Sequence, residues 1–108
     1  KAEDGWKDGF LAVYSPHTTC GLTINEGWDP DVKADMERFL AARVPQDWGF
    51  RHAEGNSDAH IKTSFFGSSV LVPVADGRPD LGQWQAVYLC ESDGPRVRTL
   101  RVSFLKEA

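Results

Sequence analysis

The chain has 108 residues, of which 41% are hydrophobic and 26% are charged, and this fits one globular domain with a single core. Its net charge of −4 excludes a general nucleic-acid binder, which needs a basic face. No apolar run is long enough to span a membrane and no charged-then-apolar leader begins at Lys1, so we expect a cytoplasmic protein. Cys20 and Cys90 lie far apart without metal-type spacing, which predicts two reduced thiols.

The first half of the chain predicts two strands followed by a helix. The apolar run "FLAVY", residues 10–14, is typical of a buried strand, and "GLTINE", residues 21–26, alternates apolar and polar side chains as a second strand does. A helix is expected from Asp29, a capping residue, and Pro30, which suits the first turn, as far as Pro45. One apolar stripe predicts its core-facing side: Val32, Met36, Phe39, Leu40 and Val44.

The second half predicts a short helix and three more strands. After a polar loop, residues 57–67 are typical of a helix capped by Ser57 or Asp58 and ended by Gly67. Strands are expected at residues 69–74, 83–91 and 96–105, and Pro73 places the first of them at a sheet edge or a bulge. The order β-β-α-α-β-β-β predicts a single α+β domain over residues 1–108, with a mixed, mostly antiparallel sheet and two helices.

The stretch "RHAEGNSDAH", residues 51–60, gathers metal-capable and hydrogen-bonding side chains in one loop. Its His52 and His60 are too far apart for one helical face, but the glycine-containing loop could fold back and bring them together. With His17 they are the three histidines of the chain, and three imidazoles leave a zinc ion one open position. The alternative, which the spacing alone favours, is that all three are loop or capping residues.

Other polar side chains lie at the ends of the same predicted elements. Three carboxylates are candidates for orienting a metal-bound imidazole or moving a proton: Glu26, Asp58 and Glu91. The alternatives are solvated strand ends and, for Asp58, a helix cap. Thr18 and Asn25 offer hydrogen bonds to phosphate oxygens, and Trp84 either fills the core or covers a ring-shaped ligand. Arg96 and Arg98 alternate, which predicts a solvated strand face.

Four segments together resemble, in order and spacing, the YjbQ-like family, whose members carry the name secondary thiamine-phosphate synthase. They are "YSPHTTCGLTINEGWDPDVKADMERFL", "FRHAEGNSDAHIKTSFFGSSV", "VPVADGRPDLGQWQAVYLCE" and "DGPR". The resemblance covers residues 10–105 and departs at Cys20 and Gln83, where the family has Ala and Thr. It implies a compact α+β domain that assembles as a homotrimer with sites near subunit boundaries. It also implies an amino-terminal strand before Lys1, without which a sheet edge is uncovered.

The family's shared polar positions coincide with the candidate residues, Asp58 among them, and add two more from residues 51–60: Glu54 and Asn56. The resemblance implies transfer of a pyrimidine methyl group from its diphosphate to a thiazole phosphate. The implied metal ligands are His17, His52 and His60, the implied catalytic groups are Glu26, Asp58 and Glu91, and the implied substrate-binding groups are Thr18, Asn25, Asn56 and Trp84. Zinc suits three imidazoles, whereas a diphosphate favours magnesium. A metal-dependent hydrolase, a non-catalytic trimer that binds a metal or a metabolite, and a set of intersubunit hydrogen bonds are therefore kept as alternatives.

Overall fold

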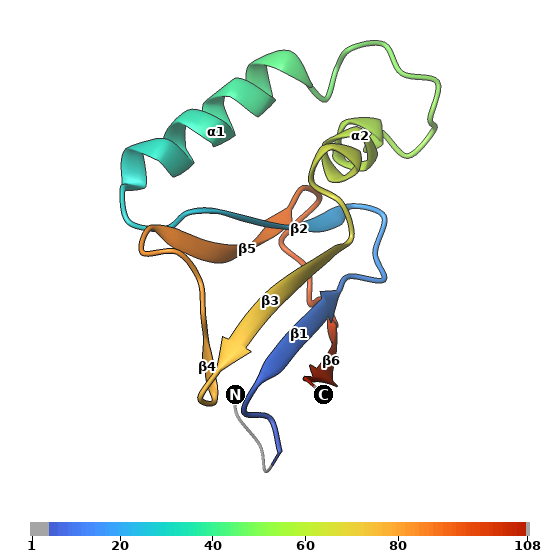
Figure 1. Cartoon of the computed structure of the whole chain (residues 1–108). Helices are drawn as coiled ribbons and strands as arrows, with labels where there is room; N and C mark the ends of the chain where they lie inside the picture. Colours follow the sequence, from blue (N-terminus) through green and yellow to red (C-terminus); the bar gives the residue numbers. More distant parts are fainter. Residues whose placement is uncertain (1–4, 108) are drawn as a thin grey trace.

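A computed structural model describes residues 5–107, in which six strands form two sheets and are accompanied by two helices (Figure 1). The strands are β1 (Gly9–Tyr14), β2 (Cys20–Glu26), β3 (Ser69–Ala75), β4 (Arg78–Pro79), β5 (Gln85–Glu91) and β6 (Arg101–Lys106), and the helices are α1 (Pro30–Arg43) and α2 (Ser57–Phe66). The larger sheet has the order β4-β3-β1-β6, and the smaller sheet pairs β2 with β5. In Figure 1 the helices lie above β2 and β5, and the larger sheet lies below them.

The predicted α+β class with two helices is confirmed, and the sheet arrangement is more divided than the sequence suggested. Every strand pair among residues 5–107 is antiparallel, so the parallel pairing of a mixed sheet does not occur there. The strands also form two sheets, because β1 pairs with β3 and β6 while β2, the next strand along the chain, pairs with β5. No helix of the described residues is long and apolar enough to cross a membrane.

The core lies where the two sheets meet. Gly21 faces α2, because a Cβ added there would lie 2.8 Å from the carbonyl oxygen of Gly67. Its neighbours Cys20 and Leu22 therefore point the other way, and both are fully buried together with Val72 of the larger sheet. Both cysteines are free thiols, as predicted.

Pro73 occupies a sheet position that does not need its missing backbone donor, as predicted. β3 is flanked on one side by β1 and on the other only by the two residues of β4. The carbonyl oxygen of Pro73 accepts a hydrogen bond from the backbone N–H of Asp80 at 2.7 Å, so the proline nitrogen also faces this nearly free side. A proline is tolerated at such an edge because no ladder hydrogen bond is lost.

The helix α1 begins and ends as predicted, but of its predicted apolar stripe only Val44, the residue that caps its end, is buried. Asp29 caps it by accepting a hydrogen bond from the backbone N–H of Asp31 at 2.9 Å. No residue within α1 is buried, and Phe39 is 60% exposed. The charged side chains of Lys33 and Glu37 share the sheet-facing side of the helix with apolar ones, and a cleft of about 420 Å³ separates this side from β5. Of the predicted stripe, Met36 and Leu40 line this cleft, Phe39 is exposed, and Val44, at the end of the helix, is buried.

Two other boundaries differ from the expectation. The cap of α2 is Asn56 rather than Ser57 or Asp58, and the Asp58 carboxylate instead accepts a hydrogen bond from Lys62 Nζ one turn later, at 3.0 Å. The end of α2 at Gly67, whose φ is 97°, agrees with the prediction. The last strand begins only at Arg101, since the residues before it are held by side-chain ion pairs and not by a ladder.

Candidate functional site

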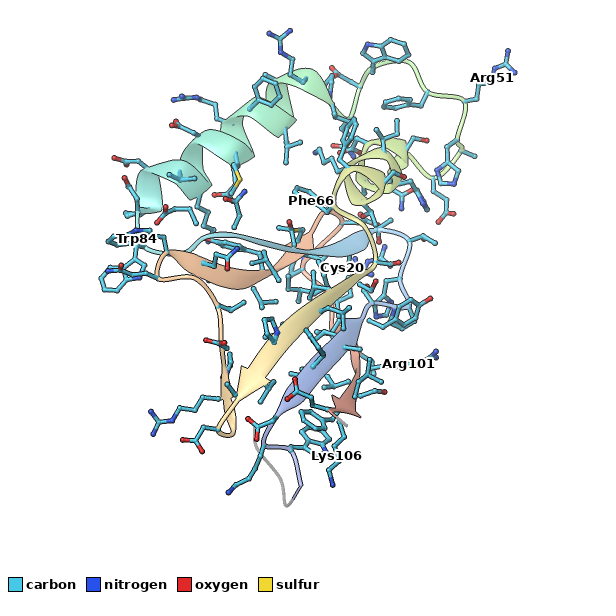
Figure 2. The ribbon with its side chains drawn as sticks, in the orientation of Figure 1. Cys20, Arg51, Phe66, Trp84, Arg101 and Lys106 are labelled. Atoms are coloured by element: carbon cyan, nitrogen blue, oxygen red, sulfur yellow. The ribbon has the colours of Figure 1, made fainter. Side chains whose placement is uncertain are left out.

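The predicted site residues lie at opposite ends of the two-stranded β2–β5 sheet. In its register Cys20 lies opposite Glu91, and Glu26 lies opposite Gln85. The seven residues of β2 span about 20 Å, so no single side chain bridges the two ends. Figure 2 shows Trp84 at one end and Cys20 at the other.

Each end has its own set of candidate residues. We call the first set, next to Cys20, the histidine end: His17, Thr18, His52, His60 and Glu91. We call the second set the tryptophan end: Asn25, Glu26, Trp28 and Trp84. Within one chain the predicted residues therefore form two separate groups and not one pocket.

His52 and His60 come together, as the folded-back loop predicted. Their ring centres are 5.3 Å apart and the ring planes are inclined by 77°. Gly55, whose φ is 77°, provides the turn that only glycine adopts readily, and its carbonyl oxygen accepts a hydrogen bond from Gln46 at 3.2 Å. Two imidazole nitrogens about 2.0–2.1 Å from one zinc ion at a tetrahedral angle place the ring centres about 5 Å apart. The spacing of the ring centres is compatible with two ligands of one cation and equally with an edge-to-face contact between the rings.

His17 lies on the other side of the histidine end and is held by main-chain groups. Its Nε2 is 3.0 Å from the carbonyl oxygen and 3.2 Å from the backbone nitrogen of Thr99. Thr18, the next residue, lines an open depression of about 350 Å³ together with His60 and the hydroxyl-bearing Thr63. Thr18 thus reaches the depression beside His60, whereas His17 itself does not line it.

The histidine end fits a metal only in part. Two imidazoles are suitably placed, and Glu54 lies close by, with Oε1 3.6 Å from His52 Nε2. Among residues 5–107, however, no group of three or more histidine, cysteine, aspartate or glutamate side chains is arranged to hold a metal ion. The three histidines of one chain thus do not meet around a single point in the way the sequence suggested.

Glu91 is held by an arginine that the sequence interpretation placed on a solvated face. Arg98 Nε donates to one carboxylate oxygen of Glu91 at 2.6 Å, and Arg98 Nη2 donates to the other, which also accepts the backbone N–H of Asp93. The Arg98 side chain is only 7% exposed. Its hydrogen bonds lower the pKa of Glu91 from 4.5 to about 2. Glu91 is therefore ionised at neutral pH, and both of its carboxylate oxygens accept hydrogen bonds. This favours a structural role for Glu91 over the predicted role in proton transfer.

The tryptophan end presents two exposed indole rings. Trp28 and Trp84 meet edge to face with ring centres 5.6 Å apart, and Trp28 Nε1 donates to the carbonyl oxygen of Gln83 at 3.1 Å. Glu26 accepts the backbone N–H groups of Trp28 at 3.1 Å and Asp29 at 3.4 Å, so it stabilises the turn into α1. Trp84 is not a core residue, and its proposed contact with a ring-shaped ligand stays a prediction. Trp28, next to it in space, was not among the candidates from the sequence.

The other predicted residues make local contacts. Asn25 accepts the backbone N–H of Glu26 at 2.7 Å, and Asn56 Nδ2 donates to Asp93 at 2.8 Å. Asp58 is buried and paired with Lys62. These contacts shape the ends of the elements, and none of them tests a substrate-binding role.

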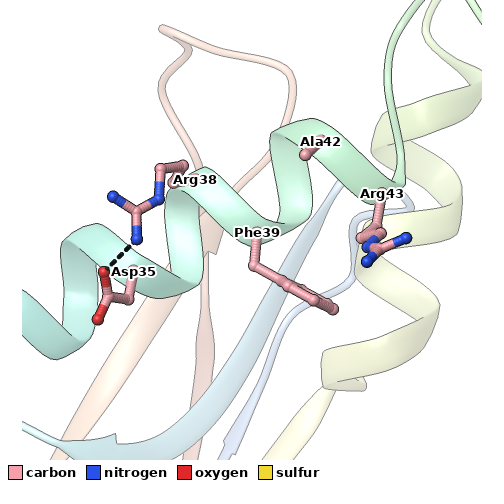
Figure 3. A pocket seen from close by; sticks show the side chains of 5 residues that line it. All are labelled: Asp35, Arg38, Phe39, Ala42 and Arg43. Atoms are coloured by element: carbon pink, nitrogen blue, oxygen red, sulfur yellow. Dashed lines mark hydrogen bonds and ion pairs between the residues drawn. The ribbon is translucent and has the colours of Figure 1, made fainter.

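A further depression, on the outer face of α1, is lined by none of the residues predicted for the functional site. It has a volume of about 560 Å³ and is lined by side chains of that one helix, among them Phe39, with the Arg43 guanidinium 5.5 Å from its ring centre (Figure 3). Arg38 and Asp35 form an ion pair of 2.8 Å there. This ion pair is solvent-exposed and gives a contrast to the pair of Arg98 and Glu91, in which the Arg98 side chain is enclosed and Glu91 is partly exposed.

Comparisons with known sequences match the chain to one family. The family model "UPF0047 protein YjbQ-like" matches residues 1–107. The UPF0047 protein MJ1081 of Methanocaldococcus jannaschii is 49% identical over 104 residues, which are 96% of this chain and 75% of that protein. The UPF0047 protein YugU of Bacillus subtilis is 48% identical over 104 residues, which are 95% of this chain and 79% of that protein.

Solved structures give the same result. The conserved hypothetical protein TT1486 of Thermus thermophilus has a TM-score of 0.88 at 45% identity, over 94% of this chain and 81% of that one. An uncharacterized conserved protein of the YjbQ/UPF0047 family from Clostridium acetobutylicum has a TM-score of 0.87 at 45% identity, over 92% of this chain and 77% of that one. Thiamine-phosphate synthase activity and metal dependence stay predictions for the present chain.

Proposed function

Since this chain belongs to the UPF0047 YjbQ-like family, we propose that it is a metal-assisted enzyme acting on a small phosphorylated substrate. In this proposal His52 and His60 supply two ligands of a divalent cation, with zinc favoured by the imidazole donors. The single observation that carries the proposal is the 5.3 Å separation of the two ring centres. It is the spacing that two imidazoles adopt around one tetrahedral ion.

The cation site is completed in a homotrimer, with His17 of a second copy as the third imidazole. Two observations support assembly. Among residues 5–107 the three histidines of one chain do not meet at one point, so a third imidazole requires a second copy, and so does a substrate that contacts both ends of the sheet about 20 Å long. In addition, the larger sheet has an exposed apolar face formed by Phe10, Tyr14, Leu71 and Leu105, which the strand register places on one side.

The finer proposal for the reaction is transfer of a pyrimidine methyl group from its diphosphate to a thiazole phosphate. A bound cation supplies charge stabilisation for the leaving diphosphate. Two observations support these roles: Thr18, whose hydroxyl can bind phosphate oxygens, lines the depression beside His60, and the exposed indole rings of Trp28 and Trp84 offer apolar faces to a heterocycle. Metal-dependent hydrolysis of a phosphorylated substrate uses the same groups and is the alternative reaction.

A second candidate function is a non-catalytic trimer that binds a metal or a metabolite. It is favoured by the contacts of the three predicted catalytic carboxylates. Two of the three predicted catalytic acids, Asp58 and Glu91, are engaged in ion pairs. Of those three, Glu26 has no ion pair with any residue from 5 to 107, and it accepts two backbone N–H groups. A site with few free proton-transfer groups suits binding better than acid–base catalysis.

Zinc titration of the full chain tests the metal site. We expect the His60→Ala variant to bind zinc at least about 100-fold more weakly than the wild type, because one of the two preplaced ligands is lost. Arg38→Ala, which removes an exposed ion pair on α1, is the matched control and should bind zinc normally. Unchanged zinc affinity in His60→Ala would refute the proposal.

Product analysis separates the two candidate functions. Wild-type protein loaded with zinc or magnesium is mixed with a pyrimidine methyl diphosphate and a thiazole phosphate, and with simple phosphate esters. Diphosphate release that disappears in His60→Ala supports the enzyme. Tight zinc binding by a trimer without turnover of these compounds supports the binding protein.

A further inference from the structure

The segment between β5 and β6, residues 92–100, is joined to the histidine-bearing parts of the chain by side-chain contacts. Arg98 Nη2 donates to Thr19 Oγ1 at 2.9 Å in addition to its two bonds to Glu91. Thr19 follows His17 by two residues and ends the loop that carries it. One guanidinium thus connects the end of β5, its own segment and the His17 loop.

A second contact joins the same segment to α2. Asp93 Oδ2 accepts hydrogen bonds from Asn56 Nδ2 and from Arg96 Nη2, each at 2.8 Å. Asn56 is the capping residue of α2, whose first turn leads to His60. The segment 92–100 is therefore in contact both with the loop of His17 and with the start of the helix that carries His60.

The residue next to Arg98 holds the ring of His17. Thr99 is bonded to His17 Nε2 through its main chain, with the carbonyl oxygen the nearer partner at 3.0 Å. If Nε2 carries the proton and donates it to this oxygen, Nδ1 is left with a free lone pair. A carbonyl that accepts the remote ring proton is the common way in which proteins orient a histidine that binds a metal.

We propose that Arg98 is a positioning residue for His17: by anchoring the segment that carries Thr99, it fixes the imidazole in the Nε2–H form with Nδ1 available as a ligand. The inference rests on the proposed function for the use of Nδ1, but the fixed tautomer is a property of the metal-free protein. A planar guanidinium is required because its donors reach both oxygens of Glu91 and the hydroxyl of Thr19 together. A lysine at this position is charged, but its single ammonium cannot make the same fork.

The experiment reads the His17 tautomer directly. Long-range ¹H–¹⁵N spectra of the metal-free full-length chain, labelled at histidine nitrogens, distinguish Nε2–H from Nδ1–H rings. We expect His17 to be in the Nε2–H form in the wild type and a mixture of both forms in Arg98→Lys. Arg38→Lys, which changes an exposed arginine in an ion pair, is the matched control and should keep the wild-type spectrum.

Two results would overturn the proposal. One is a wild-type His17 protonated on Nδ1, which would mean that Nε2 accepts the Thr99 N–H; this measurement does not depend on whether any variant folds. The other is a folded Arg98→Lys protein with an unchanged His17 tautomer. Glu91→Gln, which removes the charge but not the acceptor, is the second variant and is expected to give a smaller mixture of the same kind.

Zinc titration of the same proteins separates this inference from the proposed function. We expect zinc affinity to fall about 10–100-fold in Arg98→Lys, the range for loss of a group that orients a metal ligand. If the His17 tautomer changes in Arg98→Lys but the wild type binds no zinc, the positioning role is supported and the metal site is refuted. If zinc binding is lost in His60→Ala but the His17 tautomer is unchanged in Arg98→Lys, the metal site is supported and the positioning role is refuted.

Discussion

The Glu91→Gln substitution is expected to lower the free energy of unfolding at neutral pH by about 2 kcal/mol. The change leaves the Arg98 guanidinium, 7% exposed, without its counter-charge. Removing one partner of a fully buried pair costs about 3–5 kcal/mol. The Glu91 side chain is 27% exposed, so water screens part of this loss, and glutamine keeps one acceptor oxygen. For a domain near this size, 2 kcal/mol corresponds to a melting temperature lower by about 8 °C.

The effect of Glu91→Gln is also expected to depend on pH. The folded-state pKa of Glu91 is about 2, below its ordinary 4.5, mainly because of the hydrogen bonds from Arg98. Between these two values the unfolded chain binds more protons than the folded one, so the stability that Glu91 contributes is complete above about pH 5 and is lost as the pH falls toward 2. The full shift corresponds to about 3 kcal/mol, which solvent screening reduces to about 1–2 kcal/mol.

Urea unfolding followed by tryptophan fluorescence, at a fixed protein concentration, measures both effects. The difference between wild type and Glu91→Gln should be constant from about pH 7 to about pH 5 and should shrink as the pH falls from there to about 3. Asp35→Asn, which breaks the exposed pair with Arg38, is the control and should cost less than about 0.5 kcal/mol at any pH. A Glu91→Gln loss that equals the control, or that is the same at both ends of the pH range, would refute the assigned role of this ion pair.

Three further predictions concern packing, thiol reactivity and assembly. Gly21→Ala should lower the free energy of unfolding by at least about 2 kcal/mol in urea titrations, because its Cβ would lie 2.8 Å from the backbone oxygen of Gly67; a loss below about 0.5 kcal/mol would contradict the close packing of α2 on β2. Burial raises the pKa of Cys90 to about 11 and that of Cys20 above its ordinary value, so both thiols should react with Ellman's reagent at neutral pH far more slowly in the native protein than in urea, and equal rates would contradict their burial. Leu71→Lys, on the exposed face of the larger sheet, should convert the proposed homotrimer into monomers in sedimentation experiments. A trimer unchanged by the substitution would place the subunit contact elsewhere, and a monomeric wild type would refute the proposed assembly.

Local features of the sequence determined where several elements begin and end. Asp29 and Pro30 start α1 at the predicted place, since a capping carboxylate and a preset φ act within one turn. Gly67 ends α2 because the backbone there has a positive φ. The apolar run of β1 became the central strand of its sheet, and the pairing of His52 with His60 followed from the glycine in the loop between them. The helix ends and the histidine pair depend on neighbours in the sequence, whereas the central place of β1 depends on its pairing with the distant strands β3 and β6.

Only the tertiary structure decided which charged side chains are buried and which candidate residues meet. Arg98 alternates with Arg96 as a residue on a solvated strand does, yet it is enclosed because Glu91 and Thr19, 7 and 79 positions away, converge on it. The same long-range pairing of β2 with β5 placed Trp84 and His17 at opposite ends of a sheet, although both types of residue suit one site chemically. Residue type and spacing specify what a side chain can do. The residues that contact it are set by strand pairing between distant parts of the chain, which no local pattern indicates.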